Sequence, residues 1–525
     1  MIINVLAVLF CLLAIYWFAF KEGFFSGVVH FACVLVSGAL AFAFWEPLAL
    51  AMLGSGMREW AWGLSLLALF SVFLFVLRVI GNLAIPEKVN VPNAVDVVGG
   101  GVVGAGSGII TVGILMLGVG FLPVGALGGK IGFVRDGAGQ PTRQGTLVPF
   151  ASMTEAFYAG VSQGAFAPMT NAGNLAVSYP ELADQAWSLQ RDTDEKGRIE
   201  LTAAPGDLKI GTPYFGSYGT GGEDYFVVPV TVGKTGFHRG ASFVLSASQA
   251  RLIGDPSGSQ TAQSVFPTAW REGGKMYLFD GSTNYATNLP GTQEVTMQLA
   301  FPAAGLGGQQ PSSLLFKGLR IPLAPATTDL AALQDSGGGA SSSYDKNAPR
   351  VPAPYVEMGS QLGVIFNKND APSGMETDSG AITLADGVDI PAYTKGNPNK
   401  SLRVERIYEL PGTKLVRVDV SRGRSPIDIW GDVRVNAGED AKLVLVDSQG
   451  NTFDAIGWLH RKESDRLINV RVDDRRGVDS IGDVPMLSSA GKDTLILLFR
   501  IPKGREVKAM KLGDKTILTT DLAVN

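Results

Sequence analysis

The sequence predicts a membrane all-α four-helix bundle followed by two all-β immunoglobulin-like sandwich domains. Three observations predict this fold class. Only nine charged side chains lie in residues 1–129 of the 525-residue chain. Four long apolar runs fill that same part. From about residue 196 onward, apolar and polar residues alternate with the period of a β-strand, between clusters of turn-forming residues.

The first apolar run, residues 2–20, carries no charged side chain and is long enough to cross a hydrocarbon core of ~30 Å as a helix. A cleaved signal peptide would have a basic start and a small-residue cleavage site, and this run has neither. Three more runs follow, at residues 24–45, 60–77 and about 97–127. Because the loops between them are short, we predict a four-span transmembrane domain over residues 1–129, with the lipid bilayer as its partner.

The fourth run carries Gly100, Gly104 and Gly108 at a spacing of four residues. In lipid, small residues at this spacing allow helix backbones to approach closely. We expect these glycines to be helix-packing residues within the bundle, and oligomerisation through the fourth helix is the second option. No acidic or basic residue lies in the middle of any run, which disfavours a transporter because coupling ions need partners in the bilayer.

Two turns of the membrane part have recognisable chemistry. Lys21 and Gly23 lie in a charged-Gly-Phe turn between the first two runs. Asn93 precedes the fourth run and is expected to be its N-cap, with the carboxylate of Asp96 near the positive end of the helix dipole. Both turns are expected to be structural.

Together with the four short-looped spans and the glycine-rich fourth run, these turns resemble the bacterial colicin V production protein family. The resemblance covers roughly residues 1–165 and includes the segment 147–150 before an amphipathic stretch. Glu22, beside Gly23, and Val97, after Asp96, depart from the family's pattern. The resemblance implies a multi-pass protein of the bacterial inner (cytoplasmic) membrane with a part in toxin production or export, or in envelope homeostasis.

The side of the membrane on which the polar part lies follows from the resemblance. Positive charge in the short loops is nearly balanced between the two sides, so it decides nothing. In the family that this chain resembles, the charged-Gly-Phe turn is generally taken to be cytoplasmic, and some relatives carry an extracytoplasmic protease after the same spans. Residues 130–525 are therefore expected outside the cytoplasm.

Residues 130–195 are predicted to form juxtamembrane amphipathic helices. The first is expected over residues 149–166, with an apolar stripe of Phe150, Met153, Phe157 and Val161. It would lie in the membrane interface, on the mouth of the bundle or against the soluble part. A second short helix is expected over residues 180–189.

The strand-rich remainder divides into a first β-sandwich over residues 196–324 and a second over residues 359–525. Residues 325–358, rich in Ala, Gly, Ser and Pro, are expected to form a flexible linker. Three ordered matches indicate that the second sandwich is a divergent copy of the first: residues 276–281 with 443–448, 297–302 with 495–502, and 316–320 with 510–514.

Signatures of chemistry are weak. No Gly-x-Ser-x-Gly elbow occurs, and neither His238 nor His460 stands beside a serine or cysteine in an activated context. Both cysteines lie in apolar runs, so the polar part has no disulfide framework or cysteine-ligated metal site. The carboxylates at 192–195 and 473–474 fit solvated turns, and those at 428–432 and 447–451 fit calcium ligands or turns equally well. We therefore expect no catalytic residue, cofactor or metal.

The formal net charge of −4 argues against a nucleic-acid partner. The leading expectation is a non-enzymatic integral membrane protein whose extracytoplasmic β-sandwich modules bind partner proteins or envelope glycans. Four tryptophans either contact such a ligand or pack in the core: Trp187, Trp270, Trp430 and Trp458. The alternatives are a membrane-tethered hydrolase of the serine-protease type and a subunit of a secretion or transport complex that makes contact through the fourth helix.

Overall fold

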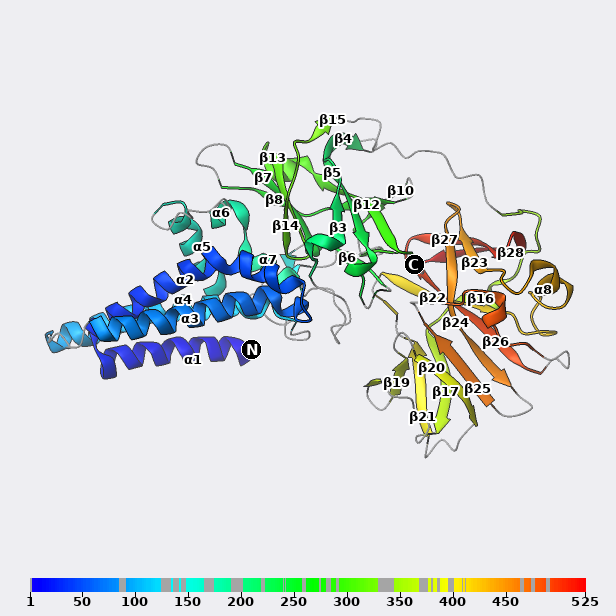
Figure 1. The fold of residues 1–525 in the computed structure, drawn as a ribbon, viewed down its shortest axis with the longest axis horizontal. Coiled ribbons are helices and arrows are strands. Elements are labelled where there is room, and N and C mark those ends of the chain that lie inside the picture. Colours follow the sequence, from blue (N-terminus) through cyan, green and yellow to red (C-terminus); the bar gives the residue numbers. More distant parts are fainter. Residues whose placement is uncertain are drawn as a thin grey trace. The chain divides into compact units, whose positions relative to one another are not determined.

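The N-terminal part of the computed structural model consists of long apolar helices, as predicted (Figure 1). They are α1 (Ile2–Trp17), which continues into a π-helical turn η1 (Phe18–Glu22), α2 (Phe24–Leu53), α3 (Ala61–Ala84) and α4 (Asn93–Gly120). Among the residues that the structure describes, these four helical segments are long and apolar enough to cross a membrane. Their length and composition indicate a membrane protein.

The structure describes residues 2–525 except for 85–90, 124–133, 136–140, 143–147, 165–173, 190–201, 219–221, 239, 241, 257–260, 273–274, 280–284, 289–291, 329–343, 368–375, 379–380, 385–387, 395–400, 408, 411, 463–466, 474–476 and 488–491. The acidic run 192–195 and most of the predicted linker therefore lie outside the described residues.

Two helices extend beyond the predicted apolar runs. Helix α2 passes through Pro47 and ends at Leu53, and α3 ends at Ala84, because apolar side chains continue past the expected ends. Arg78, the residue directly after the predicted run 60–77, consequently lies inside α3. Helix α1 contacts α4, and α4 in turn contacts α2 and α3. Large apolar side chains such as Phe75, 70% exposed, cover the outward faces, which suits contact with lipid.

Helix α5 (Phe150–Ser162) packs against α4, and its buried face differs from the predicted stripe. The buried residues include Phe150, Thr154 and Tyr158, whereas Met153 is exposed. The reason lies in the helices beneath: at Gly38 and Gly113 a Cβ would collide with Tyr158 and Thr154. Glycines of α2 and α4 thus receive the small or polar face of α5, which a count of apolar residues does not detect.

Two short helices follow, α6 (Leu175–Ser178) and α7 (Leu182–Ser188). The carboxylate of Glu155 in α5 accepts hydrogen bonds from the backbone N–H groups of Leu182 (2.8 Å) and Ala183 (3.0 Å), at the start of α7. The predicted second helix therefore forms, two residues shorter at its beginning.

The rest of the chain is mostly β, as predicted (Figure 1). Its earlier strands are β1 (Val134–Arg135), β2 (Pro141–Thr142), β3 (Leu208–Ile210), β4 (Tyr214–Tyr218), β5 (Glu223–Gly233), β6 (Val244–Ser246), β7 (Ala250–Asp255), β8 (Ser264–Val265), β9 (Ala269–Glu272), β10 (Lys275–Leu278), β11 (Tyr285–Thr287), β12 (Glu294–Pro302), β13 (Gln310–Phe316), β14 (Leu319–Pro322) and β15 (Thr327–Thr328). Its later strands are β16 (Val356–Met358), β17 (Gln361–Asn367), β18 (Glu376–Asp378), β19 (Ala381–Leu384), β20 (Val388–Thr394), β21 (Ser401–Ile407), β22 (Thr413–Asp419), β23 (Leu443–Asp447), β24 (Thr452–Lys462), β25 (Leu467–Val472), β26 (Thr494–Pro502), β27 (Arg505–Leu512) and β28 (Lys515–Val524), with helix α8 (Asp432–Ala437) between β22 and β23.

The chain forms two units that differ from the predicted domains. The first consists of Met1–Val230, Ser246–Thr268 and Leu299–Leu333, and the second of Thr231–Leu245, Ala269–Gln298 and Gln334–Asn525. Parts of the predicted first sandwich, including β9 and β10, thus group with the C-terminal strands. The core of the second unit includes the buried side chains of Trp430, Phe453 and Phe499.

Strand pairing supports the predicted duplication, but it pairs one segment of the second copy with a different segment of the first than the sequence matches suggested. In the first unit β8, β7, β13 and β14 pair in that order, and in the second β24, β23, β27 and β28 do the same, all antiparallel. Likewise β4 pairs with β5 and β16 with β22. Strand β23 therefore corresponds to β7, and not to residues 276–281 as predicted. The pairing order separates β7 from β10, two short apolar strands that the sequence pattern alone does not tell apart.

Residues 344–358, assigned to a flexible linker by composition, are ordered in the structure. Strand β16 pairs with β22, and the backbone N–H of Val351, which is itself buried, donates to the carbonyl oxygen of Thr519 (3.0 Å). Backbone hydrogen bonds hold this segment despite its low apolar content, so the linker prediction is wrong here.

Candidate functional site

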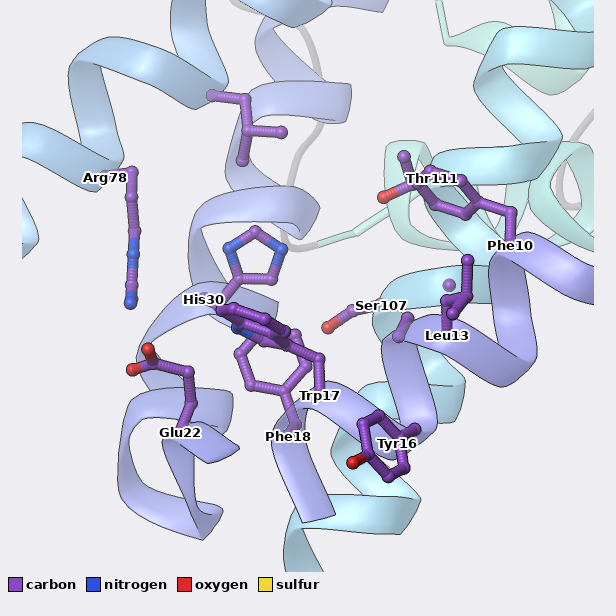
Figure 2. A pocket seen from close by; sticks show the side chains of 13 residues that line it. Phe10, Leu13, Tyr16, Trp17, Phe18, Glu22, His30, Arg78, Ser107 and Thr111 are labelled. Carbon is purple, nitrogen blue, oxygen red and sulfur yellow. The ribbon is translucent and has the colours of Figure 1, made fainter. Parts of the chain in front are cut away.

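A groove of about 770 Å³ lies on the side of the helical bundle (Figure 2). Residues of α1 and η1 form one wall, α3 contributes Leu74 and Arg78, and α2 and α4 contribute His30, Ser107 and Thr111. The wall from α1 is mainly aromatic and aliphatic, with Phe10, Leu13, Tyr16 and Trp17. The groove therefore combines an apolar surface with a few polar groups, which is the usual make-up of a small-molecule site.

Opposite charges meet at one end of the groove. The Ser26 hydroxyl donates to Glu22 Oε2 (3.1 Å) and accepts from Arg78 Nη2 (2.9 Å), while Arg78 Nη1 donates to the Ser26 carbonyl oxygen (3.4 Å). Figure 2 shows the side chains of Glu22 and Arg78 extending toward each other. Ionisable side chains within a membrane domain are rare and often mark a functional site.

Two further polar side chains line the groove. The His30 ring stacks on Phe18, with ring centroids 5.0 Å apart. Ser107 is 2% exposed, and its hydroxyl has no hydrogen-bond partner among the described residues. Figure 2 shows this hydroxyl directed toward the space between α1 and α4 that Trp17 and His30 also border. An unsatisfied buried hydroxyl costs free energy, so it calls for a ligand or water.

The two predicted turns contact each other beside this groove. Gly23, at a φ of 83°, separates η1 from α2, and Asp96 Oδ1 accepts a hydrogen bond from the Phe24 backbone N–H (2.6 Å). A Cβ on Gly23 would lie 2.6 Å from Asp96 Oδ1. Asp96 thus caps α2, as well as lying in the first turn of its own helix.

Lys21 and Asn93, the other two predicted turn residues, do not cap a helix. Lys21 is an exposed residue in the last turn of η1. Asn93 is the first residue of α4, and Pro92 occupies the N-cap position without a side-chain bond. The expectation of an Asn93 cap is therefore wrong, because the helix begins one residue earlier than the motif suggests.

The glycines of α4 face α1 of the same chain. An added Cβ would meet the Phe18 backbone at Gly100, the Ala14 carbonyl oxygen (2.8 Å) at Gly104, and the Cys11 Cα (3.1 Å) at Gly108. This face is thus filled within the chain. The exposed residues Val95, Val98 and Val102 mark a different face of α4.

His460, in the β-rich part, does not have the setting of an accessible general base. His460 is 5% exposed within β24, and its Nε2 lies 3.9 Å from Asp493 Oδ2, beyond hydrogen-bond distance. His238 forms a backbone bridge with Ser242. A base must come within hydrogen-bond reach of a substrate proton, and the burial of His460 prevents this.

The carboxylates of the acidic turns at 428–432 and 447–451 accept hydrogen bonds from backbone N–H groups of the same turns. Asp428 Oδ1 accepts from the Trp430 backbone N–H (2.9 Å), and Asp447 accepts from the backbone N–H groups of Gln449 (2.9 Å) and Asn451 (2.8 Å). No group of three or more His, Cys, Asp or Glu suited to a metal ion occurs in the described part of the chain. Of the four candidate tryptophans, Trp187, Trp270 and Trp430 are buried and Trp458 is partly buried, so they fill cores.

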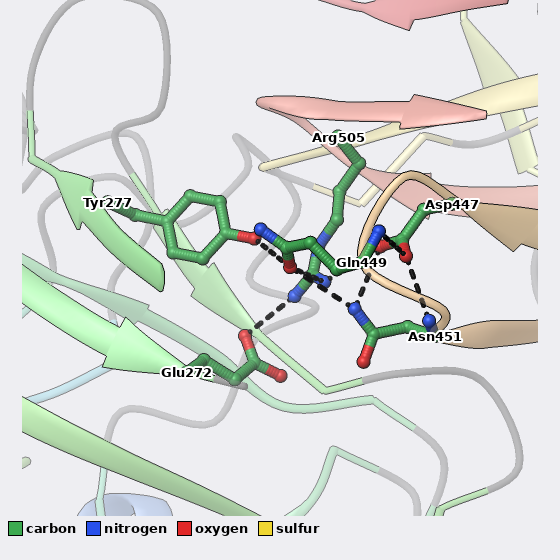
Figure 3. Close-up of polar contacts among 6 residues, drawn as sticks. All are labelled: Glu272, Tyr277, Asp447, Gln449, Asn451 and Arg505. Carbon is green, nitrogen blue, oxygen red and sulfur yellow. Dashed lines mark hydrogen bonds and ion pairs between the residues drawn. The ribbon is translucent and has the colours of Figure 1, made fainter. Parts of the chain in front are cut away.

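A buried polar cluster forms within the second unit around Arg505 (Figure 3). The guanidinium pairs with Asp447 Oδ2 and Glu272 Oε2, each at 3.0 Å, and Tyr277 Oη donates to Gln449 Oε1 (2.9 Å). Burial raises the pKa of Glu272 and of Tyr277, while the nearby Arg505 opposes the shift. The paired charges connect β9 and β10 to β23 and β27, which is a structural role.

The residues of the groove were not found by sequence reasoning. Glu22 was treated as a departure from a motif, Arg78 as a helix end, and His30 and Ser107 received no role. The available signal was a charged residue just past the end of each of two apolar runs, Glu22 after residues 2–20 and Arg78 after residues 60–77, together with His30 inside a third run. Helical rotation places them on one side of the bundle, and that rotation depends on the packing of α1 against α4.

No known protein-family model matches this chain, and neither the search of curated proteins nor that of solved structures finds a similar protein.

Proposed function

We propose that this chain is a non-enzymatic integral membrane protein of the bacterial inner membrane whose helical bundle carries a β-rich binding region outside the cytoplasm. The supporting observation is the attachment of strand β14 and of the segment around Asp207 to residues of α2 and of the α2–α3 connection. Arg320 of β14 pairs with Glu46 of α2, its Nη2 3.1 Å from Oε2 and its Nε 3.3 Å from Oε1. Arg58, between α2 and α3, pairs with the buried Asp207.

An aromatic cluster strengthens this attachment. Trp45 Nε1 donates to the Trp62 carbonyl oxygen (2.8 Å), and the Trp45 ring contacts Trp62, Phe121 and Tyr179. Gly318, at a φ of 81° in the β13–β14 turn, lies against Trp62, where a Cβ would come 2.8 Å from Nε1. A bidentate ion pair and buried aromatic contacts suit a firm connection between a membrane anchor and the region that it carries.

The proposed role is in toxin production or export, or in envelope homeostasis, as the resemblance to colicin V production proteins implies. We propose that the strands form immunoglobulin-like sandwiches that bind partner proteins, and this is favoured over glycan binding because the large tryptophans fill cores. Deleting the gene should reduce secretion of a peptide toxin or increase sensitivity to detergents. Normal secretion and normal sensitivity together would contradict this role.

Reporter fusions test the proposed orientation. Alkaline phosphatase, active only outside the cytoplasm, should be active when fused after Asn525 and inactive when fused to a chain truncated at Lys88. Green fluorescent protein should give the opposite pattern. Phosphatase activity only at Lys88 would show that the β-rich region lies in the cytoplasm.

A subunit of a secretion or transport complex is the second candidate. The observation that favours it is the charged groove, since Arg78 and Glu22 lie within the membrane part. The hydrolase alternative lacks such support in the described residues.

A further inference from the structure

We propose that the groove between α1 and α3 binds one phospholipid whose headgroup carries both a phosphate and a primary ammonium group, as in phosphatidylethanolamine. This inference goes beyond the proposed function and does not depend on it. Three features of the groove favour such a lipid: the charge pattern at its end, the unsatisfied Ser107 hydroxyl inside it and the length of its apolar wall.

The charge pattern matches a zwitterionic headgroup. Arg78 uses one hydrogen bond from each terminal nitrogen on Ser26, and a guanidinium has five N–H donors. The remaining donors suit the oxygens of a phosphate, which arginine binds with charge-assisted hydrogen bonds. Glu22, joined to Arg78 through Ser26, places a negative charge at the same end of the groove, which attracts an ammonium group. The trimethylated amine of phosphatidylcholine has no N–H to donate to Glu22. The purely anionic headgroup of phosphatidylglycerol would be repelled by the negative charge of Glu22.

The interior of the groove suits the linkage below the headgroup. The buried Ser107 hydroxyl has no partner within the described residues, and it is directed into the groove (Figure 2). The ester carbonyl oxygens of a phospholipid follow the phosphate toward the acyl chains and accept hydrogen bonds. One such oxygen would satisfy the hydroxyl, and Figure 2 shows His30 between Ser107 and the charged end of the groove.

The length of the wall suits an acyl chain. From Glu22 to Phe10 the helical chain rises about 18 Å at about 1.5 Å per residue, and half of a hydrocarbon core is about 15 Å. Leu13, Trp17 and Leu74 border this length. A lipid of one leaflet could therefore place its headgroup at Arg78 and Glu22 and its acyl chain along α1.

Native mass spectrometry of the full-length chain, purified in a mild detergent, tests this proposal. The protein is incubated with phosphatidylethanolamine, phosphatidylcholine or phosphatidylglycerol of identical acyl chains. We expect one bound phosphatidylethanolamine per chain, retained about tenfold better than either other lipid. Arg78→Gln and Glu22→Gln should each reduce this retention about tenfold, the effect of losing a hydrogen bond to a charged group. Lys21→Gln, which removes an exposed charge from the same turn, should leave it unchanged.

A second pair of variants separates binding in the groove from general contact with the bundle surface. Leu74→Trp fills the groove and should reduce retention of all three lipids, whereas Phe75→Trp alters a neighbouring side chain that faces outward. Circular dichroism and size-exclusion chromatography establish that each variant is folded. Equal retention of the three lipids, retention unaffected by Arg78→Gln and Leu74→Trp, or a dimer without bound lipid would each overturn the proposal.

Discussion

The carboxylate of Asp96 accepts a hydrogen bond from the backbone N–H of Phe24, with 2.6 Å between Oδ1 and N, across 72 positions of sequence. This contact joins the turn before α2 to the first turn of α4. It satisfies a backbone donor that the start of α2 would otherwise leave open, and it places a negative charge at the positive end of that helix. The turn before α2 and the first turn of α4 are thus one structural feature.

Replacing Asp96 with alanine should destabilise the bundle by about 0.5–2 kcal/mol, the usual effect of losing an N-cap. Thermal unfolding of the full-length chain in detergent, followed by tryptophan fluorescence, measures this change. Asn93→Ala is the matched control, because Asn93 is exposed and makes no side-chain cap bond. Equal losses in both variants would show that the Asp96–Phe24 bond contributes little.

Gly104→Leu should separate α1 from α4, because a Cβ already comes 2.8 Å from the Ala14 carbonyl oxygen. Overpacking typically costs about 1–3 kcal/mol, and contact with rigid backbone favours the upper part of that range. Gly101→Leu is the control, since its Cβ has ordinary contacts at 3.9 Å. Denaturant titration compares the two, and a lower midpoint for Gly101→Leu than for Gly104→Leu would contradict the packing.

The Arg320–Glu46 pair should show an interaction free energy of about 1–3 kcal/mol in a double-mutant cycle with Arg320→Gln and Glu46→Gln. Both side chains are largely buried and the pairing is bidentate. The Arg350–Asp521 pair, with side chains 75% and 46% exposed, should give less than about 1 kcal/mol. Similar values for the two pairs would mean that the first pair does not hold the β strands on the bundle.

Glu272 should make stability fall as pH rises above its ordinary pKa near 4.5, because burial raises its pKa in the folded chain. In that window the folded state holds more protons than the unfolded state. The contribution of Glu272 to the free energy of unfolding is therefore fully present below pH 4.5. It is lost as pH rises through the raised pKa of the folded state. Glu272→Gln removes the titration and should flatten this part of the stability profile, measured by unfolding between pH 4 and 7. An unchanged slope would contradict the assignment.

Local patterns in the sequence predicted much of the fold. Four apolar runs became four helices, and the alternating segments became strands, because helix and strand formation follow from short-range hydrophobic periodicity. The helix ends were less predictable: apolar residues continue past Leu77, so α3 reaches Ala84 and Arg78 lies within it. The ordering of residues 344–358 depends on pairing with β22 and contact with Thr519, which composition does not reveal.

The sequence by itself determined the division between an apolar helical part and a polar β-rich part, since both depend on composition and period. Only the tertiary structure decided which residues meet: Phe24 with Asp96, Gly104 with Ala14, Arg78 with Glu22 through Ser26, and Arg505 with Glu272. The physical reason is that each of these contacts depends on how helices rotate and strands pair across long stretches of chain. Local propensity specifies elements, whereas packing specifies their neighbours.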